Sequence, residues 1–113
     1  DFIFLRHALE HSPYPIFSLM EYNRILKQFG KIYIEVPQPD CDRKHEENLN
    51  HYSILGQNQL AALIVRTGFN IDRFENFEFD LEVRNAEFPE KSTKLREKFY
   101  CIVATKQRPL DIK

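Results

Sequence analysis

The chain opens with DFIFLRHALEH (residues 1–11), a short apolar run that ends abruptly in ionisable side chains. Phe2 to Leu5 is continuously apolar and partly β-favouring, which is typical of a strand covered on both faces, as in a parallel sheet. Because the chain begins inside a hydrophobic strand, without a polar lead-in, we expect it to continue a longer polypeptide whose remaining part carries some of the fold.

The bulk composition narrows the class of protein. At 113 residues the chain is enough for one small domain or a piece of one. Sixteen basic and seventeen acidic residues give a net charge of -1, which argues against nucleic-acid and membrane partners. No apolar run approaches the roughly 20 residues that cross a bilayer, and no signal-like segment opens the chain. We therefore expect residues 1–113 to form a single partial domain of a cytoplasmic protein with two free thiols, Cys41 and Cys101.

The segments after residue 11 predict a strand–helix–strand unit. Ile16 to Lys27 places apolar side chains at helical spacing, and Gly30 follows as a stop signal. Ile32 to Val36 then predicts a second strand, which ends at Pro37. With the first strand this gives a βαβ unit, which is normally right-handed and parallel.

The rest of the chain predicts one helix and two strands, joined by polar segments. Residues 37–55 form a long polar connection without a clear period, and such connections are commonly functional or mobile. Beyond it we expect a helix over Gln59–Thr67, a strand over Phe69–Phe79 with a bulge between Ile71 and Phe74, a charged connection over Asp80–Lys98, and a last antiparallel strand over Phe99–Thr105.

Ionisable side chains lie just beyond the first strand. In open α/β sheets ligands bind beyond the carboxyl ends of the strands, and His7, Glu10 and His11 occupy that position. A histidine titrates near neutral pH and a neighbouring carboxylate can orient it, so this cluster could remove a proton from a substrate. The alternative is a structural turn in which Glu10 caps the chain and the histidines bond to backbone.

The pentad HALEH (residues 7–11) also matches the H-x-x-E-H pattern of inverted zinc peptidases. That metal site needs both histidines on one face of a continuous helix. Here the pentad follows directly on a strand and meets Pro13 and Pro15 within one turn. We therefore predict no metal at this motif.

Two further observations concern ligand contacts. In the long connection His51 is the best candidate for a substrate contact, whereas His45, Glu46 and Glu47 are expected to be solvated. A phosphate or nucleotide cradle needs closely spaced glycines, but the three glycines of the chain, Gly30, Gly56 and Gly68, lie far apart. The sequence thus carries no such loop.

Several of these segments together resemble a known family. Residues 1–11 with their LEH turn, Pro15 and NRILKQFGKIYIEVP (residues 23–37) are similar to the second half of class I S-adenosylmethionine-dependent methyltransferases, of the type 11, 12 and 23 groups. His51-Tyr52-Ser53, followed by a helix and by Gly68-Phe69, matches a later segment of that family. The resemblance covers residues 1 to about 79 well and the last strand loosely.

The resemblance implies an α/β fold, the second half of a Rossmann-like methyltransferase sheet, with parallel strands, helices and a closing antiparallel strand. Leu5, Arg6 and His7 would border the methionine end of S-adenosylmethionine. Glu10 and His11 would face a small-molecule acceptor, with His11 or His51 as the base. The glycine-rich loop and the acidic ribose-binding residue lie upstream in such enzymes, and this sequence has neither.

A different class of function remains open from the sequence. The half-sheet could be a non-catalytic interaction module, or an inert fragment of the same fold. An exposed strand edge at Asp1 to Leu5 would then favour pairing with another chain, including a second copy of this one.

Overall fold

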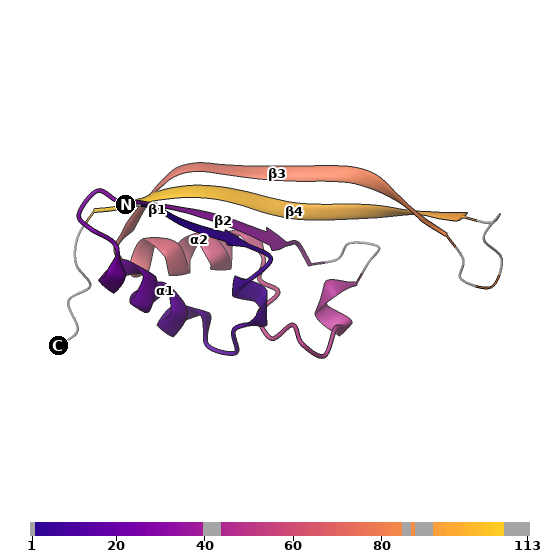
Figure 1. The fold of residues 1–113 in the computed structure, drawn as a ribbon, viewed down its shortest axis with the longest axis horizontal. Helices are drawn as coiled ribbons and strands as arrows, with labels where there is room; N and C mark the ends of the chain where they lie inside the picture. Colours follow the sequence, from indigo (N-terminus) through magenta and orange to yellow (C-terminus); the bar gives the residue numbers. More distant parts are fainter. Residues whose placement is uncertain (1, 40–43, 85–86, 88–91, 108–113) are drawn as a thin grey trace.

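The computed structural model describes residues 2–39, 44–84, 87 and 92–107. Every helix and strand that the sequence predicts is present (Figure 1). In chain order the elements are β1 (Phe2–Arg6), the 3-10 turn η1 (Leu9–His11), α1 (Pro15–Ile25), β2 (Lys31–Pro37), the 3-10 turn η2 (His45–Glu47), α2 (Gln57–Arg66), β3 (Phe69–Arg84) and β4 (Ser92–Lys106).

The four strands form one sheet in the order β1-β2-β4-β3. β1 and β2 are parallel, with Phe2 opposite Lys31, and α1 connects them as the predicted βαβ unit requires. β4 runs antiparallel to both of its neighbours, β2 and β3. The predicted fold class, a Rossmann-like sheet with parallel strands and a closing antiparallel strand, is confirmed.

Both α-helices lie on the same side of the sheet (Figure 1). The core forms between them and the sheet, because alternate residues of each strand point toward the helices. Its central members, all 0% exposed, are Leu19 of α1, Ile64 of α2, Ile32 and Ile34 of β2, and Ile102 and Ala104 of β4. We call this side of the sheet the covered face and the opposite side the open face.

The strand Phe2–Leu5 is not covered on both faces, and that part of the sequence prediction is wrong. Ile3 and Leu5 pack against the core, but Phe2 and Phe4 are 60% and 61% exposed on the open face. The reason is that the described helices cover only one side of the sheet (Figure 1). Phe4 instead stacks on Tyr33 of β2, with ring centroids 5.0 Å apart.

The segment Asp80–Lys98, expected to be a connection, is largely strand: β3 continues to Arg84 and β4 begins at Ser92. The physical reason is cross-strand charge pairing, because Asp80 lies opposite Arg96, Glu78 opposite Lys98 and Glu82 opposite Lys94. The Arg96 guanidinium also reaches the carboxylates of Glu78 and Asp80, at 2.8 and 3.1 Å. Beyond the helices the hairpin extends as a two-stranded ribbon (Figure 1).

The predicted bulge in β3 is confirmed by a register shift between Ile71 and Arg73. One extra residue, Asp72, lets both Ile71 and Phe74 pack against the core although they are an odd number of positions apart. The Asp72 carboxylate meets the Thr105 hydroxyl at 2.5 Å and the Lys31 ammonium at 3.3 Å. The bulge is thereby anchored on the open face to β2 and β4.

Cys101 is a free thiol, as predicted, and its sulfur lies 3.3 Å from the Tyr33 hydroxyl on the open face. The other predicted free thiol, Cys41, lies outside the described residues. Among the residues that the structure describes, no helix is long and apolar enough to cross a membrane.

Candidate functional site

The site begins where β1 ends. The chain reverses direction at His7, whose φ of 53° lies in the left-handed region that costs free energy for a residue other than glycine. The His7 backbone N–H donates to the Glu35 carbonyl at 2.8 Å, which ties this turn to the end of β2. The turn leads directly into η1, so Glu10 and His11 lie beyond the carboxyl end of β1.

The long connection returns to this turn and supplies a third residue. The backbone N–H groups of Tyr52 and Ser53 both donate to the Glu10 carbonyl, at 2.8 and 3.0 Å. This docking places the His51 ring beside the His11 ring, with centroids 4.7 Å apart. The structure thus brings together Glu10, His11 and His51, the three residues that the sequence analysis nominated for catalysis.

Backbone carbonyls set the tautomer of both imidazoles. His11 Nδ1 lies 2.7 Å from the Asn50 carbonyl oxygen, and His51 Nδ1 lies 2.8 Å from the His45 carbonyl oxygen. A carbonyl only accepts a hydrogen bond, so Nδ1 carries the proton in each ring. In the neutral form each Nε2 therefore keeps a free lone pair, which can accept a proton or bind a metal ion.

The Glu10 carboxylate is buried, and only one of its two oxygens lies near a described polar partner. The residue is 1% exposed, and its Oε1 has no hydrogen-bond partner among the described residues. Its Oε2 lies 3.6 Å from His7 Nδ1. Buried polar atoms are nearly always hydrogen-bonded, so this carboxylate oxygen is suited to accept a hydrogen bond or to bind a cation. One ligand atom from each of Glu10, His11 and His51 lies within 4.8 Å of the other two.

The three residues expected to border the cofactor take different positions. Leu5 packs against the core on the covered face. Arg6 Nε donates to Glu35 Oε2 at 2.9 Å, and His7 Nε2 lies at 2.9 Å from the same oxygen. Sequence reasoning missed Glu35; the available signal was a carboxylate in an otherwise apolar strand, where a partner is needed.

A polar network on the open face continues from Glu35. The Tyr33 hydroxyl donates to Glu35 Oε1 at 3.1 Å and lies beside the Cys101 thiol. The hydrogen bond with Cys101, burial and the Glu35 carboxylate together raise the pKa of Tyr33 above its ordinary value. Burial raises the pKa of Cys101 as well. Both groups stay protonated at neutral pH, so this network offers neither a thiolate nor a phenolate nucleophile.

His45 is not solvated, contrary to the sequence prediction. Its side chain is largely buried against β4, and Nε2 lies 2.7 Å from Glu97 Oε1. The cause is tertiary, because Glu97 belongs to the part of β4 that the sequence analysis took for a connection. Glu47 is exposed as expected, and the side chain of Glu46 lies outside the described part of the chain.

The glycines do not form a cradle for a nucleotide. A Cβ added at Gly56, the N-cap of α2, would meet nothing nearer than the Gln59 side-chain oxygen at 4.0 Å, so the backbone there is not shaped by a close approach. Gly68, with φ of 93°, ends α2 rather than opening a helix toward a phosphate. The described residues do not by themselves fit the whole of S-adenosylmethionine.

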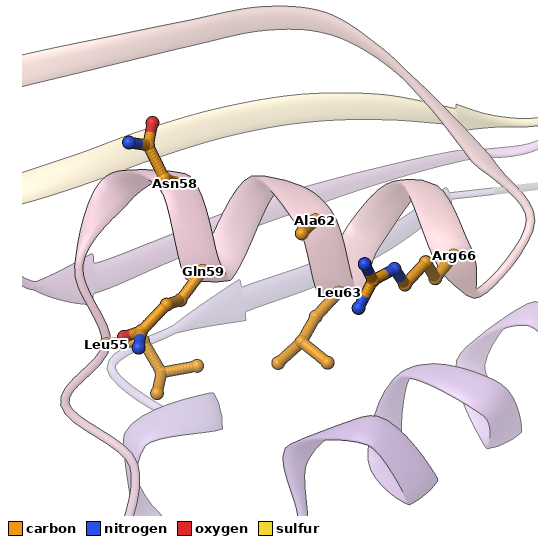
Figure 2. Close-up of a pocket in the computed structure, with 6 residues that line it drawn as sticks. All are labelled: Leu55, Asn58, Gln59, Ala62, Leu63 and Arg66. Carbon is orange, nitrogen blue, oxygen red and sulfur yellow. The ribbon is translucent and has the colours of Figure 1, made fainter.

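A shallow groove runs along the exposed side of α2 and holds about 450 Å³. Figure 2 shows Leu55, Gln59, Leu63 and Arg66 along it, with Asn58 and Ala62 on the same helix. None of these side chains belongs to the group around Glu10, so the groove and the candidate site are separate features.

Comparison with known proteins finds structures of similar fold but no protein of similar sequence. No protein-family model matches the chain, and no curated protein matches it at a significant level. Solved structures do match. A presumed methyltransferase from Bacillus halodurans aligns with a TM-score of 0.74 at 14% identity over 95% of this chain. The YcgJ protein of Bacillus subtilis aligns at 0.67 and 13% identity over 96% of it. A SAM-dependent methyltransferase from Archaeoglobus fulgidus aligns at 0.63 and 16% identity over 94%.

These likenesses define the fold class: a mixed α/β sheet of the Rossmann-like kind found in methyltransferases. The chain spans only part of each of these structures, 64% of the first two and 59% of the third.

Proposed function

We propose that this chain is the carboxyl-terminal, acceptor-side half of an S-adenosylmethionine-dependent methyltransferase that acts on a small molecule in the cytoplasm. The observation that carries the proposal is the convergence of Glu10, His11 and His51 beyond the carboxyl end of β1. The sheet that holds them is similar to the sheets of the Bacillus halodurans and Archaeoglobus fulgidus structures named above. In open α/β sheets this is the edge at which ligands bind.

The chemistry asked of these residues is modest. S-adenosylmethionine supplies an activated methyl group when it is bound, and the protein's main task is to hold the acceptor in line with it. His11 or His51 accepts a proton from the acceptor at its free Nε2, if the acceptor must lose one. The Glu10 carboxylate lies close to both imidazoles and orients the ring that takes the proton.

In this proposal, the part of the enzyme that binds most of the methyl donor is formed by polypeptide other than residues 1–113. Leu5, Arg6 and His7 border the methionine end of the cofactor, and the other half binds its ribose and adenine. Two observations support this division. β1 is an edge strand whose outer side pairs with no described strand, and the open face exposes Phe2 and Phe4. Both surfaces suit the remaining strands and helices of a complete sheet.

The first experiment is the intact mass of the polypeptide in its native source, compared with 13.6 kDa for these residues. A mass greater by a further half-domain, followed by 1:1 binding of S-adenosylhomocysteine in calorimetry, supports the proposal. A mass of 13.6 kDa without cofactor binding, alone or with a partner chain, contradicts it and leaves the interaction module as the function.

The catalytic assignment has its own test in the cofactor-binding protein. We expect His11→Ala to lower turnover by roughly 100-fold or more, within the range for a general base, with S-adenosylhomocysteine affinity unchanged. The matched control is Glu47→Gln, an exposed residue of η2, which should leave turnover as it is. Unchanged turnover in His11→Ala would remove His11 from the reaction.

A further inference from the structure

We infer that Glu10, His11 and His51 bind one divalent transition-metal ion of the zinc type. A nitrogen that ligates the ion cannot also accept a proton, so in the metal-loaded chain this inference replaces the role of histidine base in the proposed methyl transfer. Metal binding is measured with no donor or acceptor present, so its test is separate from that of methyl transfer. The three side chains come from η1 and from the connection between β2 and α2, and one ligand atom of each lies within 4.8 Å of the others.

The tautomers are those of metal-binding histidines. A histidine that ligates a metal usually donates its second ring N–H to a carbonyl or carboxylate, which fixes the ring orientation. His11 does so toward the Asn50 carbonyl and His51 toward the His45 carbonyl, at 2.7 and 2.8 Å. Both Nε2 lone pairs are therefore ready to bind a cation without any change of tautomer.

Glu10 supplies the independent observation. Its side chain is almost completely buried, and its Oε1 has no hydrogen-bond partner in the part of the chain that the structure describes. A buried carboxylate oxygen without a partner costs free energy, and a cation removes that cost by direct coordination.

The ligand set selects the kind of ion. Two imidazole nitrogens with one carboxylate oxygen are typical of Zn²⁺, Fe²⁺ and related ions, whereas Mg²⁺ and Ca²⁺ prefer oxygen ligands alone. Zn²⁺ with ligands at about 2.1 Å holds them roughly 3.4 Å apart, so the three groups close slightly on binding. His11 is exposed, so the remaining coordination positions stay open to water or an acceptor.

The site differs from the H-x-x-E-H pattern of the sequence. In that pattern His7 and His11 would be the metal ligands, with Glu10 as base. In the structure His7 Nε2 is engaged by Glu35 Oε2 at 2.9 Å, and His51 takes its place beside Glu10 and His11. The ligands therefore converge through the fold rather than along one helix.

The test is a titration of the full chain, freed of metal with a chelator, with Zn²⁺ in a calorimeter and with Co²⁺ in a visible spectrometer. We expect one ion per chain, a dissociation constant below about 10 µM, and Co²⁺ bands of a nitrogen and oxygen site without thiolate charge transfer. The last feature separates this site from binding at Cys41 or Cys101. Histidine ¹⁵N spectra should show Nδ1–H tautomers that persist when Zn²⁺ shifts the Nε2 resonances.

Two variants and one control locate the ion. Glu10→Gln keeps the shape of the buried side chain and should weaken Zn²⁺ binding at least 100-fold, as should His11→Ala. The control is Glu75→Gln, which removes a half-buried carboxylate of β3 that is paired with Arg73 and is none of the three ligands, and it should bind Zn²⁺ within about threefold of the unmodified chain. Circular dichroism checks that each variant is folded.

The result in the unmodified chain decides the inference even if a variant fails to fold. No binding, several weak ions per chain, or a thiolate band in the Co²⁺ spectrum would overturn it. Equal weakening of Zn²⁺ binding in Glu75→Gln and Glu10→Gln would also overturn it. Because no donor is present, these outcomes do not depend on whether the protein transfers methyl groups.

Discussion

The two faces of the sheet are built from alternate residues of the same strands and differ sharply. On the covered face Ile34 and Ile102 are opposite one another and completely buried beneath the helices. On the open face their neighbours Tyr33 and Val103 are also opposite one another but only half-buried. Phe4 extends the open face onto β1 and is mostly exposed.

The difference shows what each face does. The covered face holds the chain together, since burial of apolar surface is the main stabilising contribution to folding. The open face combines exposed aromatic rings with the network of Arg6, Glu35, Tyr33 and Cys101. An exposed apolar patch rimmed by polar groups is typical of a surface that binds something else.

The largest expected effect is a loss of stability when one side chain of the covered face is truncated, compared with a truncation on the open face. Ile34→Ala leaves a cavity between sheet and helices and should lower the free energy of unfolding by about 2–5 kcal/mol. Phe4→Ala removes more atoms but from an exposed site, and should cost less than about 1 kcal/mol. Urea unfolding followed by circular dichroism measures both. Equal losses would mean that the open face stabilises the chain as much as the core does.

An intermediate effect is expected on self-association. The outer edge of β1, which pairs with no described strand, and the exposed rings of Phe2 and Phe4 form one surface, so the isolated chain should dimerise through it. Phe4→Glu should raise the dissociation constant about tenfold or more, because a charge would be buried in the contact. Sedimentation velocity measures it.

The control for self-association is Phe79→Glu, which changes an exposed phenylalanine on the hairpin. It should leave the dissociation constant unchanged. If both variants weaken the dimer equally, the contact does not lie at β1. If the chain is monomeric at every concentration, its strand edge does not pair with a second copy.

The smallest effect concerns Asp72 on the open face. The Thr105 hydroxyl and the Lys31 ammonium hold the pKa of the Asp72 carboxyl below its ordinary value. A carboxyl whose pKa is lower in the folded state than in the unfolded state stabilises the fold at any pH above its unfolded-state pKa. That stabilisation is lost as the pH falls through the folded-state pKa. Asp72→Asn should therefore lower stability by roughly 0.5 kcal/mol at about pH 7 and by nothing measurable near pH 2.

Urea midpoints at the two pH values measure the Asp72 effect. Thr105→Val should reproduce most of it, and the double variant should lose little more, since the two side chains share one interaction. A loss that is independent of pH would show that Asp72 acts through its shape at the bulge and not through its charge.

The sequence predicted the elements and their order because local patterns carried them. Apolar spacing gave α1 and α2, and the slip in alternation between Ile71 and Phe74 correctly predicted the bulge in β3. It failed over Asp80–Lys98, where charges dominate the composition. The alternation of apolar and charged residues, which continues from Phe77 and Phe79 through Leu81 to Val83, was the available signal, but the charges that pair with this strand lie on the opposite strand.

The candidate site was predicted in part. Glu10 and His11 follow a strand, and their position beyond its carboxyl end was open to inference from topology. That His51 lies beside them depends on the two backbone hydrogen bonds that dock Tyr52 and Ser53 onto the Glu10 carbonyl. Backbone hydrogen bonds between distant segments leave no residue pattern. The side-chain pairs of His7 with Glu35 and of His45 with Glu97 also join distant segments, so their partners could not be assigned from local spacing.

The sequence by itself determined the strand–helix–strand unit, the closing antiparallel pair and the bulge, because side-chain spacing and turn residues act over a few positions. Only the tertiary structure decided that both helices cover one face, that Glu10 is buried with an oxygen that has no hydrogen-bond partner among the described residues, and that the rings of His11 and His51 lie beside one another. The arrangement of Glu10, His11 and His51 arises from contacts between residues 10–11 and residues 50–53, about forty positions apart. Packing of such distant segments determines which side chains are buried and which atoms come into contact, and no local pattern encodes it.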